Sequence, residues 1–233
     1  MSARLPLFPL STVLYPGLVL PLHIFEARYR TLMADLTAHL EADALDESML
    51  GDDAPVFGVI AIRSGRESGT TEAPMLYEIG CAAALRQVER LPDGRFDLLT
   101  SGTRRFLVRD LDTAGPYLVA EVEYLPEEIG TAPPALRAAV RDAYVAYRDQ
   151  LIDVAGQAPR VRGTPPSDPT VLSYLVAAAM LLELTEKQRL LEAQDTGERL
   201  RAELALLRRE RGILGRLPSV PATDLVGGAT SPN

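Results

Sequence analysis

The side chains that most often carry out catalysis are scarce in this sequence. Lys187 is the single lysine, Cys81 is the single cysteine, and the two histidines are His23 and His39. Lys187 stands in LTEKQRLL rather than after a glycine-rich loop, so the sequence has no phosphate-cradling GxxxxGK[ST] motif. A serine–lysine nucleophile pair needs a lysine of lowered basicity, and we expect Lys187 to be a solvated residue at a helix start instead.

The sequence also gives little support for a metal site or for acid–base catalysis. Two histidines and one cysteine do not make a tetrahedral metal site with the usual spacings. Cys81 lies in a run of alanines and is expected in the core, and His23 lies between two apolar residues, which favours a hydrogen-bonded structural role. Glu127 and Glu128 follow a strand end, where neighbouring acids are generally solvated. We therefore predict a protein with no catalytic residues, no metal site and no cofactor.

Composition points to a folded protein in a reducing compartment. The chain has 233 residues, of which 47% are hydrophobic, and this is enough apolar material for one large or two modest cores. One cysteine cannot form an internal disulfide and no apolar signal segment opens the chain, so we expect a cytoplasmic protein. The apolar residues 171–184 fall short of the roughly 20 residues that a bilayer requires, and we expect a buried helix there and no membrane partner.

The elements up to residue 128 are predicted to be mainly strands. Four prolines interrupt the apolar residues 5–30 and exclude one long helix, so short extended pieces are expected. The continuous run of apolar residues at 56–62 is typical of a strand buried on both faces. Pro92, Asp93 and Gly94 predict a hairpin turn, and Ser101 with Gly102 predicts another. One amphipathic helix interrupts the strands, with an apolar face formed by Phe25, Tyr29, Leu32, Met33, Leu36 and Leu40.

The pattern becomes helical after residue 133. Asp168 before a proline is expected to cap one helix, and the spacing of Thr185 and Gln188 predicts a capping box for the next. The predicted fold class is therefore α+β. We expect a small β-barrel domain at 1–128 with one helix and an insertion, a helical bundle at 129–216 and a flexible tail at 217–233. The insertion carries six acids in residues 41–53 and contributes to the net charge of −8.

Three segments resemble the amino-terminal substrate-binding domain of Lon proteases. The first is LPLFPL, followed after a few residues by a Tyr-Pro-Gly turn and LVLPLHIFEARYR. The others are GCAAALRQVERLPDGRFDLLTSGTRRF and EKQRLLEAQDTGERLRAELALL. The resemblance covers most of residues 5–211. It implies a PUA-like β-barrel followed by a helical bundle, a module that holds unfolded or tagged polypeptide for a separate motor and peptidase.

The resemblance and the lack of catalytic motifs together predict a stand-alone, non-enzymatic Lon-type substrate-binding protein. Its expected partners are exposed polypeptide segments and a protease or chaperone that receives them. A peptide binder needs an exposed apolar groove or an unpaired sheet edge, which the proline-rich opening could supply. Leu14, Tyr15 and Leu18, around the Tyr-Pro-Gly turn, are the predicted contact residues, with closure of the barrel as their alternative role.

Other function classes remain as alternatives. PUA-like folds elsewhere bind RNA, and the β region contains arginines that could form a basic face. Interleaved acids and an aromatic content of only 6% weigh against nucleic acid as a partner. An enzyme using other residues and a scaffold that pairs with itself as a homo-oligomer are the remaining alternatives. The arginines in question are Arg86, Arg90, Arg95, Arg104, Arg105 and Arg109.

Overall fold

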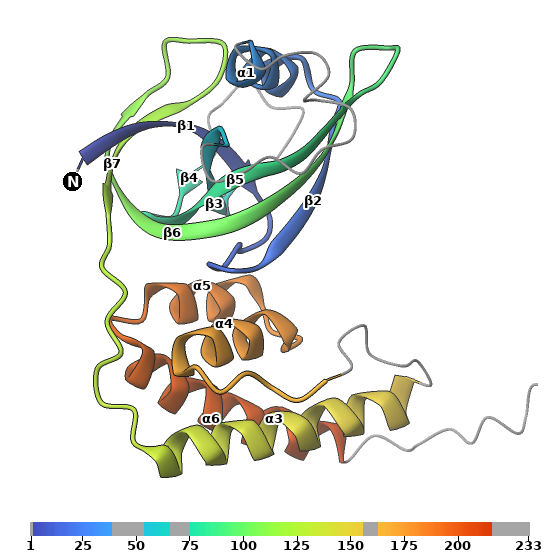
Figure 1. Ribbon diagram of the computed structural model, residues 1–233, viewed down its shortest axis with the longest axis vertical. Helices are drawn as coiled ribbons and strands as arrows, with labels where there is room; N and C mark the ends of the chain where they lie inside the picture. The colour runs from blue at the N-terminus through green and yellow to red at the C-terminus, as the bar shows by residue number, and fades with distance from the viewer. Residues whose placement is uncertain (1, 39–53, 66–74, 156–162, 216–233) are drawn as a thin grey trace, which may run out of the picture. The chain divides into compact units, whose positions relative to one another are not determined.

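The computed structural model describes residues 2–38, 54–65, 75–155 and 163–215. Across these ranges the chain forms a seven-stranded mixed sheet and five helices, an α+β fold as predicted (Figure 1). It divides into two compact units, unit 1 with Met1–Glu128 and Ala177–Gln194, and unit 2 with Ile129–Val176 and Asp195–Asn233. Residues 177–194, which we expected in the helical bundle, thus group with the strands. The predicted acidic insertion and flexible tail lie outside the described residues.

The sheet of unit 1 is built around the long strand β6. Strands run in the order β1-β7-β6-β5-β3-β4, β1 also pairs with β3 in parallel, and β2 pairs with β6 (Figure 1). Following the paired strands from β1 through β7, β6, β5 and β3 therefore leads back to β1. The strands are β1 (Ser2–Leu10), β2 (Val19–Ile24), β3 (Val56–Ser64), β4 (Met75–Leu76), β5 (Ile79–Arg90), β6 (Phe96–Asp112) and β7 (Val119–Tyr124).

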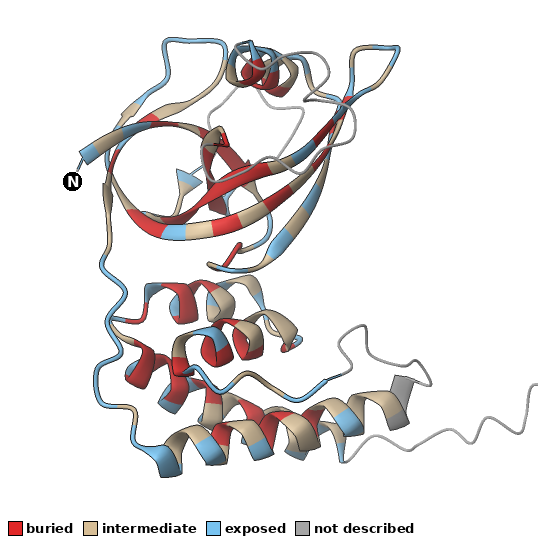
Figure 2. Ribbon diagram, viewed as in Figure 1, coloured by how far each residue is buried: buried red, intermediate tan, exposed pale blue. Residues whose placement is uncertain are grey.

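Two sequence predictions for these strands are confirmed. Strand β3 is buried along most of its length, as its continuous apolar run indicated, and the buried segments stand out in Figure 2. The hairpin between β5 and β6 turns at the predicted residues. Gly94 has a positive φ of 80°, and its N–H donates to the Leu91 carbonyl at 2.9 Å. Glycine is suited to this position because it has no Cβ.

The predicted turn at Ser101 and Gly102 is wrong. Strand β6 continues through both residues, with a shift in its pairing to β5 at this point. Gly102 contacts the segment between β1 and β2, since its N–H donates to the Leu18 carbonyl at 2.8 Å and its carbonyl accepts from Gly17 N–H at 2.9 Å. Gly102 thus lets the main chain of the segment between β1 and β2 come close to β6, and the chain does not turn at this residue.

Helix α1 (Ala27–Thr37) packs its apolar face on the sheet. Tyr29, Leu32 and Met33 are buried in one core cluster with residues from the strands, including Phe8. Phe25 was assigned to the same face, but it precedes the helix and its side chain is 58% exposed. The i, i+4 spacing to Tyr29 therefore does not place Phe25 on the buried face of α1.

Helix α5 (Leu184–Glu192) belongs to unit 1. Gln188 is buried, and its Nε2 donates to the Ile79 carbonyl of β5 at 2.9 Å. The predicted capping box is wrong, because the helix begins at Leu184 after Glu183 and no side chain caps it. The polar residue that suggested a cap instead ties the helix to the sheet.

Unit 2 contains α3 (Pro134–Ala155), α6 (Thr196–Leu214) and α4 (Pro169–Ala179) up to Val176. Helix α3 packs against α6. Asp168 caps α4 as predicted, because its Oδ1 accepts from the N–H groups of Thr170 and Val171 at 2.9 Å. Among the helices described, none combines the length and the hydropathy that crossing a membrane requires.

A buried carboxyl group lies in unit 2. Glu203 of α6 is fully buried, and within the described part of the chain both of its carboxyl oxygens lack a hydrogen-bond partner. Arg199, one turn earlier, donates to Ser173 Oγ at 3.0 Å and lies 4.0 Å from the centre of the Tyr174 ring. Burial raises the pKa of Glu203 well above its usual range, and the charge of Arg199 opposes this only in part.

We expect Glu203→Gln to stabilise unit 2 increasingly as the pH rises. Because the folded-state pKa is above the unfolded-state value, the wild-type carboxyl contributes its full stability only at low pH and loses it as the pH rises. The difference in free energy of unfolding between variant and wild type should grow by about 1 kcal/mol or more from about pH 5 to about pH 8. Urea titrations measure it, with exposed Glu198→Gln as the control. If the difference in free energy of unfolding does not change with pH, the pKa of Glu203 is not raised in the folded protein.

Candidate functional site

The residues with catalytic potential differ in how far the structure buries them. Cys81 is fully buried, and desolvation raises the pKa of its thiol. Lys187 on α5 is half-buried rather than solvated as expected, and burial lowers the pKa of its ammonium group. No group of three or more potential metal ligands occurs within the described ranges. His39 lies outside them.

His23 has the structural role that its sequence context favoured. Its Nδ1 lies 2.6 Å from Asp97 Oδ1, and its Nε2 lies 3.1 Å from Arg95 Nη1. A carboxylate only accepts and a guanidinium only donates, so this arrangement fits a neutral ring with its proton on Nδ1. Arg95 also pairs with Asp93 at 2.7 Å, which makes His23 part of a surface network that joins β2 to the hairpin.

Two of the three predicted contact residues are buried in the interior of unit 1. Leu14 is 4% exposed and Tyr15 is 1% exposed, and the Tyr15 hydroxyl donates to the Lys187 carbonyl at 2.8 Å. A role for these two in peptide contact therefore requires local opening of unit 1. Leu18 is partly buried and packs against the core cluster. The burial of Leu14 and Tyr15 favours their alternative role in closing the barrel.

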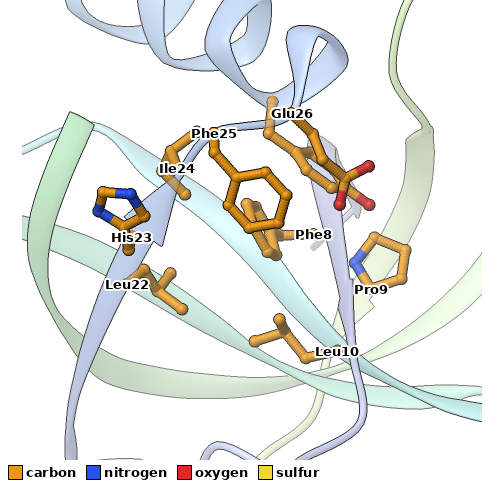
Figure 3. A pocket seen from close by; sticks show the side chains of 9 residues that line it. Phe8, Pro9, Leu10, Leu22, His23, Ile24, Phe25 and Glu26 are labelled. Carbon is orange, nitrogen blue, oxygen red and sulfur yellow. The ribbon is translucent and has the colours of Figure 1, made fainter. Parts of the chain in front are cut away.

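A small groove lies beside this region, where the end of β1 faces the end of β2. Its volume is about 110 Å³. Figure 3 shows Pro9 and Leu10 on one side and Leu22 and His23 on the other, with the Phe25 ring between them. The lining residues are Phe8, Pro9, Leu10, Leu22, His23, Ile24, Phe25, Glu26 and Tyr29.

Aromatic rings form the rigid part of the groove. Phe8 stacks on Tyr29 with ring centroids 4.1 Å apart, and it also contacts Phe57 at 6.1 Å. These three side chains are buried, whereas the Phe25 ring remains exposed beside them. An exposed ring next to a preformed apolar hollow is suited to cover an apolar ligand group. The sequence did not single out Phe25 as a contact residue, because its spacing from Tyr29 predicted a buried position.

The groove is bordered by the open edge of β2. Within the described sheet, β2 pairs on one side only, with β6. The Leu18 carbonyl accepts a hydrogen bond from Gly102 N–H of β6. Main-chain groups alternate in direction along an antiparallel strand, so those of Val19, Pro21 and His23 point to the open edge. Pro21 has no N–H to offer there. A proline at this position protects a sheet edge from pairing with another strand. A ligand at this edge is therefore expected to bind through side-chain contacts rather than through main-chain hydrogen bonds.

We expect Pro21→Thr to promote association of the protein with itself. The substitution adds an N–H donor to the open edge while leaving the pairing with β6 intact, and a symmetric pair of edges gains two donors. The association constant should rise about tenfold. Sedimentation over a range of concentrations measures it. Pro116→Thr, in the exposed loop between β6 and β7, should leave association unchanged. Equal behaviour of both variants would show that Pro21 does not guard the edge.

The arginines of the β region are engaged within the protein. Arg105 is buried and donates to carbonyl groups, and Arg86 Nε donates to Ser101 Oγ at 2.7 Å. Arg104 lies 3.9 Å from the centre of the Tyr124 ring, and Arg109 pairs with Glu123. A phosphate group would have to compete with these contacts, so the geometry does not favour the predicted alternative of a basic RNA-binding face.

Comparisons with known proteins converge on one family. A family model described as the ATP-dependent protease La (LON) substrate-binding domain matches residues 4–209. The chain is 29% identical over 204 residues to Lon protease 2 of Syntrophobacter fumaroxidans, covering 84% of this chain and 23% of that protein. It is 28% identical over 223 residues to Lon protease of Escherichia coli K12, covering 91% of this chain and 25% of that protein.

A solved structure agrees with the sequence comparisons. The Lon N-terminal domain protein from Xanthomonas campestris matches with a TM-score of 0.60 and 25% identity, covering 87% of this chain and 98% of that one. The chain spans about a quarter of the length of the curated relatives named above. The matching part is the substrate-binding domain and not the catalytic domain. The chain therefore belongs to the Lon substrate-binding domain family.

Proposed function

We propose that this chain is a non-enzymatic module that binds exposed segments of unfolded or tagged polypeptides and presents them, in the cytoplasm, to a separate protease or chaperone. Membership of the family supports substrate binding in general. The observation that carries the specific proposal is the apolar groove between β1 and β2, with the exposed ring of Phe25 beside it. Leu18, which is partly buried, remains a candidate contact outside the groove.

The neighbour pairing from β1 through β7, β6, β5 and β3 back to β1 supports a further part of the proposal. We infer a PUA-like barrel as the scaffold of unit 1, because pairing that returns to its first strand removes sheet edges. In this scaffold β2 keeps an open edge, and the groove lies beside it. The groove thus lies next to a strand edge that the described sheet leaves unpaired.

We expect Phe25→Ser to weaken binding of a labelled, permanently unfolded model protein about tenfold. Covering a phenyl ring is worth about 1.5–3 kcal/mol when the ring is fully buried, and Phe25 has part of this area left to cover. Because the ring is exposed in the free protein, its loss should leave the fold intact. Fluorescence anisotropy measures the dissociation constant and circular dichroism checks the fold.

The control for this variant is Met75→Ser. Met75 on β4 is also exposed and belongs to unit 1, but it does not line the groove. Its substitution should leave the affinity unchanged. If both variants bind the unfolded protein as the wild type does, the groove is not the binding site.

The alternative of RNA binding has a direct test. Retention of RNA by filter binding should rise steeply as the salt concentration falls if phosphates are contacted, because counterions are then released. We expect no salt-dependent retention, given that the β-region arginines are engaged in the structure. Retention that falls with salt and is lost in Arg104→Gln would favour the alternative.

A further inference from the structure

We propose that the groove selects aliphatic side chains, and that it holds one side chain of valine, leucine or isoleucine size from an extended segment. This inference rests on the proposed function and names the chemistry of its ligand. It follows from the size of the groove, the rigidity of its floor and the charges beside it.

The volume of the groove sets an upper limit on the group that enters. An apolar cavity of about 150 Å³ accommodates benzene. The groove, at about 110 Å³, is smaller, and its walls are formed by Leu10, Leu22 and Ile24 (Figure 3). A branched aliphatic side chain therefore enters fully, whereas a phenyl ring enters only in part and leaves apolar surface in water.

The floor of the groove cannot recede to admit a larger group. Phe8 is held between the stacked ring of Tyr29 and the tilted ring of Phe57, which is fully buried. Interiors of this kind are close-packed, so moving Phe8 inward would require displacement of core side chains. The depth of the groove is thus set by the packed core below Phe8.

The charges beside the groove favour a neutral occupant. Among the side chains that line it, Glu26 is the charged one, and its carboxylate is 2.9 Å from the guanidinium of Arg28. His23 is engaged on both ring nitrogens. A charged ligand side chain would lose its hydration without gaining an uncommitted partner, which is costly. An aliphatic group carries no such cost.

The test uses soluble peptides of one sequence with a single central residue varied among leucine, phenylalanine and glutamine. We expect the leucine peptide to bind the wild-type chain about tenfold more tightly than the phenylalanine peptide, since pockets discriminate by this factor for small size differences. The glutamine peptide should bind most weakly. Phenylalanine binding as tightly as leucine, with both tighter than glutamine, would overturn the inference and leave the proposed function intact. Equal affinity for leucine and glutamine, or no binding at all, would overturn both.

A wider groove should abolish the preference for leucine over phenylalanine. Leu10→Ala enlarges the groove from the β1 side and should shift the leucine-to-phenylalanine affinity ratio about tenfold toward phenylalanine. Leu22→Ala provides the same test from the β2 side if the first variant does not fold. Leu20→Ala is the control, because Leu20 is partly buried against the same core cluster but does not line the groove. An unchanged ratio in a folded, widened variant would refute the size limit.

Discussion

Arg105→Met should lower the free energy of unfolding of unit 1 by about 3–5 kcal/mol, one of the two largest effects expected in this protein. The Arg105 side chain is 2% exposed and makes four hydrogen bonds. Its Nη1 donates to the carbonyls of Leu191 and Ala193 at 2.8 and 2.6 Å, and its Nη2 donates to Pro126 O at 3.3 Å. Its Nε lies 3.2 Å from Glu127 Oε2.

The size of this effect follows from what the substitution leaves behind. Carbonyl groups in the last turn of a helix have no partner within the helix, and Arg105 supplies donors to the end of α5. Methionine fills a similar volume but donates nothing, so each buried carbonyl loses its partner at about 1–3 kcal/mol. The cost falls on the contact that holds α5 against the strands.

Urea denaturation measures the effect as a lower midpoint at unchanged slope. Arg109→Met is the matched control, because Arg109 lies on the same strand and pairs with Glu123 at the surface. An exposed pair of this kind is screened by solvent and contributes little to stability. Equal destabilisation by both substitutions would show that the buried contacts of Arg105 do not hold α5 in place.

Arg105 also shows what the sequence could reveal and what it could not. Strand structure was predicted on both sides of Ser101 and Gly102 from local turn signals, but the turn expected between them does not interrupt β6. The partners of Arg105 are 86 and 88 positions away, and no local pattern encodes a contact over such a distance. For the same reason, the sequence analysis placed residues 177–194 in the helical bundle, whereas the structure groups them with unit 1.

Which residues contact a peptide stays a prediction, but the structure shows which of the candidates are exposed. The proline-rich opening lines the apolar groove, Leu14 and Tyr15 are buried, and Phe25 is exposed. Spacing alone placed Phe25 on the apolar face of α1. Whether a residue at a helix boundary faces the core or solvent depends on where the chain enters the helix, and periodicity does not specify this entry.

Gly102 illustrates a second limit, because glycine has more than one structural use. It was interpreted as a turn residue, but it lies within β6 where the main chain of Tyr15 approaches it. Its φ is not positive, so its backbone conformation is open to other residues. What excludes a side chain here is the closeness of another segment, and that closeness cannot be inferred from neighbouring residues.

We therefore expect Gly102→Ala to destabilise unit 1 by about 3 kcal/mol, at the upper end of the usual cost of overpacking. A Cβ at this position would overlap the Tyr15 carbonyl oxygen and lie 2.9 Å from its carbonyl carbon and 3.1 Å from Cys81 Sγ. The first two atoms are backbone, so relief requires movement of the segment that joins β1 to β2. Gly115→Ala is the control, because its nearest contact would be an ordinary 3.5 Å.

The same substitution should also weaken peptide binding, since β1 and β2 supply the two walls of the groove and the Tyr15 segment connects them. Displacing this segment alters the spacing of the walls, so the variant that remains folded at low temperature should bind the leucine peptide less tightly and discriminate less against phenylalanine. Thermal unfolding and anisotropy measured on one sample separate the two effects. A variant as stable as Gly115→Ala would show that the Tyr15 segment moves without cost, and a destabilised variant with unchanged selectivity would place the binding site away from these walls.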